Sequence, residues 1–287
     1  MLSNQSKILI TGSSGHSGNQ IAALLKEDFE IVGIDLVHGE HTQYIGSLTN
    51  NGLLNQAIRG VDFVIHTASL HAPHVATHSR EDFIDTNIVG TLNLLKAAKN
   101  NQAKKFVYTS TTSLYGESMV NAHQAVWITE DLPTIPRDIY DITKIAAEGL
   151  CRDFFDKNGM QTTVLRVSRF WDEPLPDRVF YRMYRGLDVR DVAAAHQLAI
   201  EKDFSTFDVF NISAQSIFGQ NDLVDLKHNL HQLLHKKIPD LIPFFQKRNW
   251  PIPGSIDRVY VIEKAKHMLG YTPTFNIHQM LNDLSTE

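Results

Sequence analysis

A glycine-rich turn near the start of the chain constrains the fold more than any other stretch. The sequence KILITGSSGHSG at 7–18 is a short apolar run followed by Gly12, Gly15 and Gly18. A strand that enters such a turn and opens a helix aims free backbone N–H groups at one point, which suits a pyrophosphate. Gly12 permits the tight turn, Gly15 lets phosphates approach the backbone, and Gly18 lets the helix pack close to the strand. The pattern therefore predicts a dinucleotide-binding strand–helix unit.

A carboxylate stands where the nucleotide ribose is expected. The run EIVGI at 30–34 predicts a second strand that ends at Asp35, seventeen residues after Gly18. Asp35 would accept hydrogen bonds from the adenosine ribose hydroxyls and would repel a 2′-phosphate, so the sequence favours NAD over NADP. The alternative is a surface aspartate in a βα turn without a ligand.

Length and composition are those of a globular protein. A chain of 287 residues is long enough for one large α/β domain, or for such a domain with a small second lobe. The formal net charge of -5, without a lysine-rich run, argues against a nucleic-acid partner, and no apolar run reaches the length of a membrane span. Cys151 is the single cysteine, which excludes an intramolecular disulfide. Together with a start that lacks a signal peptide's apolar core, it predicts a cytoplasmic protein.

Strand and helix patterns alternate along the first part of the chain. Further strands are predicted at 61–66, 105–109 and 162–167, and helices at 48–58, 80–99 and 139–155. This alternation predicts an α/β fold with a doubly wound parallel sheet of the Rossmann type, whose ligands bind beyond the carboxyl ends of the strands. From about Trp171 the pattern changes, with one more strand at 207–212 and a helix at 223–235. We therefore expect a nucleotide-binding domain over 1–170 and a mainly substrate-binding lobe over 171–287, with strand 207–212 returning to the sheet.

A tyrosine and a lysine lie on one face of a predicted helix. Tyr140 and Lys144 are four residues apart. A phenol with a pKa near 10 is a poor base, but an adjacent ammonium and a positively charged nicotinamide would both favour the phenolate. Ser110 and Thr111 close the preceding strand and offer a hydroxyl that donates to a reacting oxygen. The alternative is two unrelated residues on a polar helix face.

Motifs along nearly the whole chain carry a family resemblance. They are the turn at 11–18, Asp35, HTA at 66–68, Asn87 with Gly90–Thr91, YTSTTSLYG at 108–116, YDITK at 140–144, Leu165–Arg166, DVRD at 188–191, Phe210–Ile212 and KAKHMLGYTP at 264–273. Together they resemble the extended short-chain dehydrogenase/reductases, also called the NAD-dependent epimerase/dehydratase family.

The resemblance implies a Rossmann domain that holds NAD beside the catalytic residues Thr111, Tyr140 and Lys144. Tyr140 would exchange a proton with the substrate hydroxyl while hydride moves to or from the nicotinamide. Lys144 would hold the nicotinamide ribose, and Thr111 would polarise the substrate oxygen. The implied cofactor-binding residues are Gly12, Ser14, Gly15, His16, Ser17, Gly18, Asp35, Ser47, Leu48, Thr67, Ala68, Ser69, Asn87, Thr109, Tyr140 and Lys144.

Departures from the family pattern narrow the range of expected substrates. Ser47 stands where an aspartate usually contacts adenine, and Thr112–Ser113 replaces the Asp-Glu pair of the dehydratases. Arg169 stands where epimerases that act on UDP-galactose place an asparagine. Only 24 residues separate Arg166 from Asp191, about half of what nucleotide-sugar enzymes use. This short segment resembles the uronate dehydrogenases.

In a uronate dehydrogenase-like alignment Arg178 falls where an arginine binds the substrate carboxylate, in a bidentate, charge-assisted contact. Ser110, Thr111, Arg169 and Arg178 are therefore the expected substrate-binding residues. We expect NAD-dependent oxidation of a hydroxyl on a small anionic sugar-type substrate. The alternatives are epimerisation or reduction of a nucleotide-linked sugar, and a non-catalytic NAD-binding regulator.

Three further features are the loop histidines, the residues inside the glycine turn and the expected assembly. A helix would gather His71, His74 and His78 around a metal, but the resemblance implies no metal in this loop. His16 and Ser17 replace the usual apolar pair inside the glycine turn. The resemblance also implies a homodimer that pairs through the helices at 80–99 and 139–155. The expected partners are this second copy and a small-molecule substrate, without nucleic acid or membrane.

Overall fold

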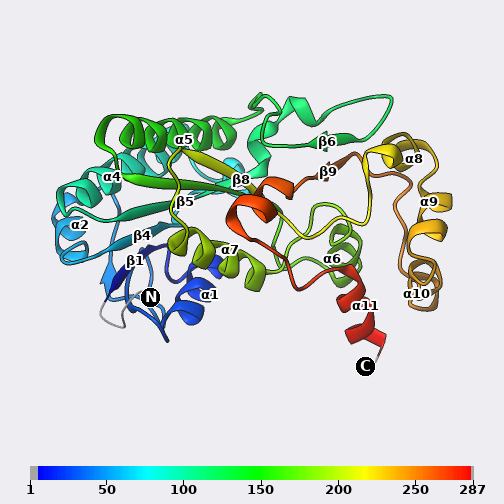
Figure 1. Ribbon diagram of the computed structural model, residues 1–287, viewed down its shortest axis with the longest axis horizontal. Helices are drawn as coiled ribbons and strands as arrows, with labels where there is room; N and C mark the ends of the chain where they lie inside the picture. The colour runs from blue at the N-terminus through cyan, green and yellow to red at the C-terminus, as the bar shows by residue number, and fades with distance from the viewer. Residues whose placement is uncertain (1–5, 286–287) are drawn as a thin grey trace.

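The computed structural model describes residues 6–285, and a seven-stranded parallel sheet forms its centre (Figure 1). Its strands, in the order β3-β2-β1-β4-β5-β7-β8, are Tyr44–Ile45, Glu30–Asp35, Lys7–Thr11, Phe63–His66, Lys105–Thr111, Gln161–Val167 and Asp208–Ile212. Chain order reverses between β1 and β4, which opens a crevice at the carboxyl ends of these strands. The prediction of a doubly wound parallel sheet is confirmed.

Helices cover both faces of the sheet, as Figure 1 shows. One face carries α1 (His16–Leu25) and α7 (Val189–Glu201), and the other carries α2 (Asn51–Ala57), α4 (Gly90–Asn100) and α5 (Ile139–Asn158). In β1, Ile8 and Ile10 belong to the first core while Leu9 belongs to the second. Side chains alternate along a strand, so a strand that is buried on both faces is apolar throughout.

The helix predicted at 80–99 is interrupted by a wider turn. It consists of α3 (Arg80–Phe83), a π-helical turn η2 (Ile84–Val89) and α4. The π turn carries Asn87, which is buried between α5 and the loop after β4. Such turns are rare inside helices and occur frequently at functional sites.

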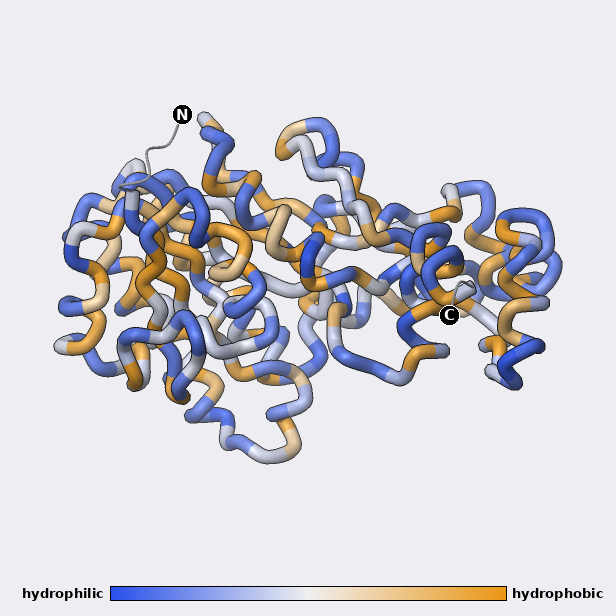
Figure 2. The backbone as a smooth tube through the Cα atoms, turned by 90° about the horizontal axis from the view of Figure 1, so that it is seen from below, coloured by the Kyte–Doolittle hydropathy of each residue, from blue (hydrophilic) through white to orange (hydrophobic). Residues whose placement is uncertain are grey.

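The second lobe has its own apolar core. Strands β6 (Val126–Ile128) and β9 (Arg258–Tyr260) pair in parallel, and α6 (Leu175–Tyr181), α8 (Leu223–His228), α9 (Leu230–Lys237), α10 (Leu241–Lys247) and α11 (Ile277–Ser285) surround them. The short helical turns of the chain are η1 (Ala72–Ala76), η3 (Thr112–Tyr115), η4 (Glu117–Met119), η5 (Gln220–Asp222) and η6 (Ala265–Leu269). Figure 2 shows apolar stretches in both the sheet region and this lobe. The sequence patterns did not predict β6 or β9, and the helix predicted at 223–235 divides at Asn229 into α8 and α9.

The two regions exchange segments of chain. Helix α7 and strand β8, which follow residue 170, pack with the sheet, whereas β6, which precedes it, pairs within the lobe. A division at residue 170 therefore stays a proposal. Among the described residues no helix is long and apolar enough to cross a membrane.

A buried ion pair joins the sheet to α5. Glu148 on α5 accepts hydrogen bonds from Arg166 on β7, at 3.0 Å from Nε and 2.7 Å from Nη2. The Ser110 hydroxyl of β5 donates to the same carboxylate at 2.5 Å, and Arg166 also donates to the Tyr115 hydroxyl at 3.0 Å. Every member of this network has a partner, which low-dielectric burial requires.

Removing one partner of this pair should destabilise the fold strongly. Glu148→Ala leaves the Arg166 guanidinium buried without its carboxylate, which should cost about 3–5 kcal/mol of unfolding free energy. Lys104→Ala is the matched control. The Lys104 side chain pairs with Asp62 at 2.8 Å but is itself exposed, so its loss should cost less than about 1 kcal/mol. Urea unfolding followed by circular dichroism measures both variants. Equal losses in the two variants would contradict the role given to the buried pair.

Candidate active site

Two adjoining cavities lie at the carboxyl ends of the strands. The glycine-turn cavity, of about 360 Å³, is lined by the turn after β1, by Asp35 and by the loop after β4. The tyrosine cavity, of about 270 Å³, is lined by the end of β5, by Tyr140 and by Lys144. The residues that line both are Ser17, Thr67, His71, Phe170 and Trp171. A ligand that fills both would therefore pass these five side chains.

Two positions of the glycine turn tolerate no side chain. Gly12 has a φ of +71°, and a Cβ on it would lie 2.8 Å from the Thr67 hydroxyl oxygen. A Cβ on Gly18 would lie 2.1 Å from the Gly12 carbonyl oxygen, so α1 approaches the turn only because Gly18 has no side chain. The turn therefore has the close strand–helix contact that the glycine spacing predicts.

Asp35 ends β2 and lines the glycine-turn cavity. Its carboxylate accepts hydrogen bonds from the backbone N–H groups of Ser14 at 2.9 Å and Leu36 at 2.6 Å, which orient it. Ser14 thus lies behind Asp35 rather than in the cavity. The exposed Ser47 also lines the cavity, and its hydroxyl pairs with that of Thr49 at 2.8 Å.

The structure divides the expected cofactor residues into three groups. Those on the glycine-turn cavity are Gly12, Gly15, His16, Ser17, Asp35, Ser47, Leu48, Thr67, Ala68 and Ser69. Thr109, Tyr140 and Lys144 line the tyrosine cavity. Ser14, Gly18 and Asn87 line neither. Ser14 donates to Asp35, and Asn87 bonds to Ser69 and Leu70, all three of which line the glycine-turn cavity. A direct contact of Ser14, Gly18 or Asn87 with the cofactor stays a prediction.

Asn87 joins the loop after β4 to α5. Its side-chain oxygen accepts from the Leu70 N–H at 2.8 Å and the Ser69 hydroxyl at 3.1 Å. Its amide nitrogen donates to the Leu70 carbonyl at 3.0 Å and to the Thr143 hydroxyl on α5 at 3.0 Å. All of its hydrogen-bonding capacity is used within the protein.

Tyr140 and Lys144 occupy the first two turns of α5, which begins after the N-cap Asp138. The Lys144 ammonium donates to the Thr109 carbonyl at 2.7 Å and lies 4.3 Å from the centre of the Tyr108 ring. Burial lowers the Lys144 pKa to about 7, although the nearby Glu148 carboxylate opposes this shift. In the protein without a ligand, the pKa of Lys144 therefore lies close to neutral pH.

The pKa of Tyr140 differs from the sequence expectation. Burial raises it above its usual range, and a hydrogen bond with the Thr111 side chain lowers it only in part. The expected depression by Lys144 does not dominate, because the ammonium is directed to the Thr109 carbonyl while the phenol is 6% exposed. Without a bound ligand the phenol is protonated at neutral pH.

The two hydroxyls at the end of β5 have different surroundings. Both Ser110 and Thr111 line the tyrosine cavity. The Ser110 hydroxyl is bound to Glu148, whereas the Thr111 side chain pairs with Tyr140 and accepts from the Ser113 N–H at 3.1 Å. Thr111, Tyr140 and Lys144 are thus brought together as predicted, while the hydroxyl of Ser110 is already engaged.

The structure places the two expected substrate-binding arginines differently. Arg169 lines the tyrosine cavity and pairs with Glu173, but Arg178 lies outside this cavity, in an exposed ion pair with Asp172 at 3.2 Å. Helix α6 turns Arg178 toward α11 and the hollows beside it. Counting residues in an alignment cannot reveal which way a short helix directs a side chain.

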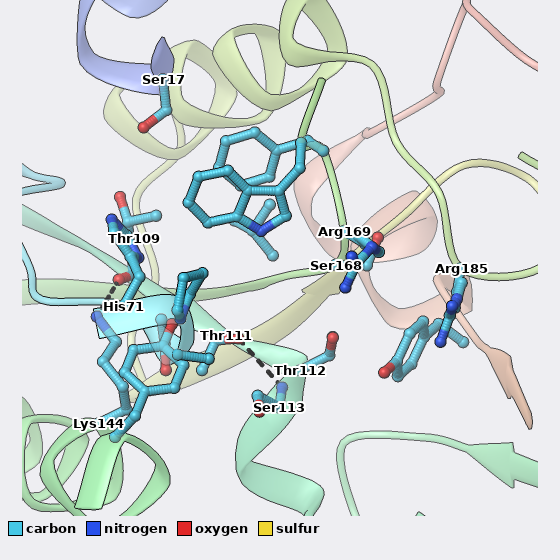
Figure 3. A pocket seen from close by; sticks show the side chains of 18 of the residues that line it. Ser17, His71, Thr109, Thr111, Thr112, Ser113, Lys144, Ser168, Arg169 and Arg185 are labelled. Atoms are coloured by element: carbon cyan, nitrogen blue, oxygen red, sulfur yellow. Dashed lines mark hydrogen bonds between the residues drawn. The ribbon is translucent and has the colours of Figure 1, made fainter. Parts of the chain in front are cut away.

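Three arginines besides Arg169 line the tyrosine cavity. They are Arg137, Arg185, which follows α6, and Arg258 on β9. Arg137 donates to Asp141 and Ser113. Arg185 and Arg258 each have a buried Nε atom without a hydrogen-bond partner, and Arg258 pairs with Asp257. Figure 3 shows Arg169 and Arg185 on the side of the cavity opposite Lys144. No local pattern marks Arg258, because only the pairing of β9 with β6 brings it to the site.

An aromatic stack accounts for His16. Its ring lies parallel to that of Phe170, with centroids 6.1 Å apart, and Phe170 stacks in turn on Trp171 at 6.1 Å. The stack holds the segment after β7 against the glycine turn. The replacement of an apolar residue by His16 therefore preserves a packing surface.

The loop histidines do not form a metal centre in the described chain, where no group of three histidine, cysteine or acidic residues is arranged to hold an ion. The rings of His71, His74 and His78 follow one another at 5.9 and 5.1 Å. His71 lines both cavities and His74 lines the glycine-turn cavity.

Comparison with known proteins identifies the fold and the family. The profile of the NAD dependent epimerase/dehydratase family matches residues 8–171, more than half of the chain. The chain belongs to this family. The family is NAD dependent, and the cofactor of this enzyme is NAD. The glycine-turn cavity fits that cofactor, because its two crowded glycines leave the turn open and the carboxylate of Asp35 lines the cavity.

Relatives in the family have different activities. A 3-beta-hydroxysteroid dehydrogenase of Mycolicibacterium neoaurum is 30% identical over 63% of this chain, a match that covers 52% of that relative. A uronate dehydrogenase of Pseudomonas putida is 22% identical over 58% of this chain and 62% of its own length. The chain thus aligns with little more than half of either protein.

Solved structures show the same fold over nearly the whole chain. A short-chain dehydrogenase/reductase superfamily protein from Agrobacterium tumefaciens, with bound NAD, superimposes with a TM-score of 0.74, 23% identity and coverage of 98% of this chain and 96% of its own. A UDP-glucuronic acid 4-epimerase from Bacillus cereus superimposes with a TM-score of 0.71 and 22% identity, and each chain is covered over 96%.

A buried histidine joins the glycine turn to the helix layer. His66 ends β4, and its Nδ1 pairs with the Thr11 hydroxyl at 2.7 Å while its Nε2 pairs with the Thr91 hydroxyl at 2.9 Å. The Thr91 hydroxyl donates to the Asn87 carbonyl, so Nε2 of His66 carries the proton and Nδ1 accepts. Burial, with the charge of Lys144, lowers the His66 pKa to about 3.

The fold should lose stability in mild acid partly through His66. Below pH 6.5 His66 is protonated in the unfolded chain, but in the folded chain it stays neutral down to about pH 3. The free energy of unfolding therefore decreases as the pH falls from 6.5 to about 3. The His66 contribution is about 1.4 kcal/mol per pH unit. Unfolding free energies measured between pH 6.5 and 4 should therefore slope less steeply in His66→Asn than in the wild type, and parallel slopes would contradict the assignment.

Proposed function

We propose that the protein is a dehydrogenase that uses NAD to oxidise a hydroxyl of a small, anionic, sugar-type substrate. The observation that carries this proposal is the polarity of the tyrosine cavity. Thr111, Tyr140 and Lys144 line one side, and Arg185 and Arg258 line the other with unpaired Nε atoms. Guanidinium groups suit carboxylates, which they bind with two parallel hydrogen bonds.

The size of the cavity supports a small substrate. Its volume of about 270 Å³ is below the roughly 300–1,000 Å³ of pockets that enclose drug-sized ligands. A nucleotide-linked sugar would need additional space beyond the arginines. The short segment between Arg166 and Asp191 forms α6 and the turn that carries Arg185, which lines the tyrosine cavity.

The proposed roles follow from the contacts of each side chain. Thr111 and Tyr140 both line the tyrosine cavity, and the Thr111 side chain is close enough to lower the pKa of the Tyr140 phenol in part, so both can reach one substrate oxygen. Tyr140 would take the proton from the substrate hydroxyl as the carbonyl forms, and Thr111 would keep that oxygen in place. Lys144, held by the Thr109 carbonyl, would bind a ribose hydroxyl and favour the phenolate by its charge. Bound NAD supplies the hydride acceptor.

Removing the phenol hydroxyl should abolish the reaction without removing the cofactor. Tyr140→Phe is expected to lower kcat by about 10²–10⁴-fold, because no group then accepts the substrate proton. NAD affinity, measured by calorimetric titration, should change little. Tyr44→Phe on β3 serves as the control, since Tyr44 lines neither cavity. Retained activity in Tyr140→Phe would overturn the proton-transfer role.

A panel of substrates tests whether the tyrosine cavity prefers small anionic sugars. The protein is incubated with NAD and free uronates, neutral sugars or UDP-sugars, while NADH absorbance and product stereochemistry are followed. We expect NADH with the acids only, and Arg185→Ala should lower kcat/KM for acids by about tenfold or more, since a charge-assisted contact contributes about 1.5–3 kcal/mol. Arg178→Ala, outside the cavity, should keep kcat/KM near the wild-type value.

The second candidate is epimerisation or reduction of a nucleotide-linked sugar. The similarity of the fold to a UDP-glucuronic acid 4-epimerase favours it. An isomerised UDP-sugar formed without NADH release would replace our proposal by this one. A non-catalytic NAD-binding regulator is less well supported, because Thr111, Tyr140 and Lys144 are all present and in contact with the cavity.

We further propose a homodimer through the helices 80–100 and 139–158. Ile84 and Ile142 on these helices are 42% and 49% exposed, which supports a covered apolar face. Sedimentation at micromolar concentration should give twice the chain mass, and a monomer would contradict the pairing. The single, buried Cys151 supports a cytoplasmic location.

A further inference from the structure

His71 occupies the boundary between the two cavities. Of the five residues that line both, it is the only one with two ring nitrogens that can donate and accept hydrogen bonds. It precedes η1, at the end of the loop that Asn87 holds in place. A ligand atom that passes from one cavity to the other must therefore come close to this imidazole.

Neighbouring rings hold the imidazole beside the candidate base. The His71 centroid lies 6.2 Å from that of Tyr140, and the ring stands perpendicular to the Trp171 indole at 5.5 Å. The His71 backbone N–H donates to Nδ1 of His74 at 2.9 Å, which fixes the turn. Figure 3 shows His71 on the same side of the cavity as Thr109 and Lys144.

The imidazole is uncharged at neutral pH. Burial, together with the charges of Lys144 and His74, lowers the His71 pKa to about 4. A neutral imidazole has one N–H donor and one acceptor nitrogen, and both suit a hydroxyl group. It does not suit the anionic end of the substrate, for which the arginines on the opposite side are placed.

We propose that His71 binds a second substrate hydroxyl, on the carbon next to the one that Tyr140 deprotonates. The substrate is then a vicinal diol with an anionic group, rather than a simple hydroxy acid. Hydrogen bonds of about 2.8 Å from each ring reach neighbouring oxygens of one ligand across the 6.2 Å between the centroids. This inference rests on the proposed dehydrogenase function.

Paired substrates test the inference. An oxidised acid from the panel is compared with its analogue that lacks the hydroxyl next to the reacting carbon. The wild type should prefer the diol by roughly 10–100-fold in kcat/KM, because an unmatched polar site rejects the analogue. In His71→Phe this preference should fall to about twofold, because the polar group that distinguishes the two substrates is gone. His71→Asn, which keeps a donor and an acceptor, should restore part of the preference.

His78→Phe is the matched control, because His78 belongs to the same loop but lines neither cavity. Calorimetric titration with NAD confirms that each variant folds and binds cofactor. A wild type without preference for the diol, or a preference that survives in His71→Phe, overturns the inference alone. Equal losses of kcat/KM on both substrates, with a shifted pH profile, also overturn it, since His71 would then take part in proton transfer. If the wild type oxidises no acid, both the proposed function and this inference fail.

Discussion

The buried pair between Glu148 and Arg166 is the interaction on which the geometry of the site depends. Glu148 lies one turn beyond Lys144 on α5, and its carboxylate receives the Arg166 guanidinium and the Ser110 hydroxyl. This pair therefore fixes the height of α5 relative to β5 and β7. Because Lys144 donates to a carbonyl of β5 from the same helix, a displaced α5 would separate the candidate base from Thr111.

Polar side chains join the cofactor side of the crevice to the same helix. His66 connects β1 to the helix layer, and Asn87 connects the loop after β4 to Thr143 on α5. These groups are buried and their hydrogen bonds are made within the protein, so they specify one arrangement of strands, loop and helix. The π turn around Asn87 gives its side chain access to both the loop and α5. His71 and Trp171 lie at the boundary that the two cavities share.

The cationic side of the tyrosine cavity has a different origin. Arg185 follows α6, and Arg258 lies on β9, whose pairing with β6 is supported by the separate apolar core of the lobe. The charge on this side thus depends on the folding of the lobe over the sheet. In the function proposed here, the sheet would hold the cofactor and the reacting groups, while the lobe would contribute the groups that select a substrate.

The sequence by itself determined the parts of this protein that depend on local geometry. Glycine spacing requires a turn that admits no Cβ, alternation of strands and helices requires a parallel sheet, and a spacing of four residues puts Tyr140 and Lys144 on one helix face. Only the tertiary structure decided the rest. Arg178 lies outside the tyrosine cavity, because the direction of a side chain on a short helix depends on how that helix packs. Arg258 lines the cavity, because the pairing of distant strands depends on the whole chain. The tertiary structure also raised the Tyr140 pKa, since burial of a phenol is a property of the folded site and not of its neighbours in sequence.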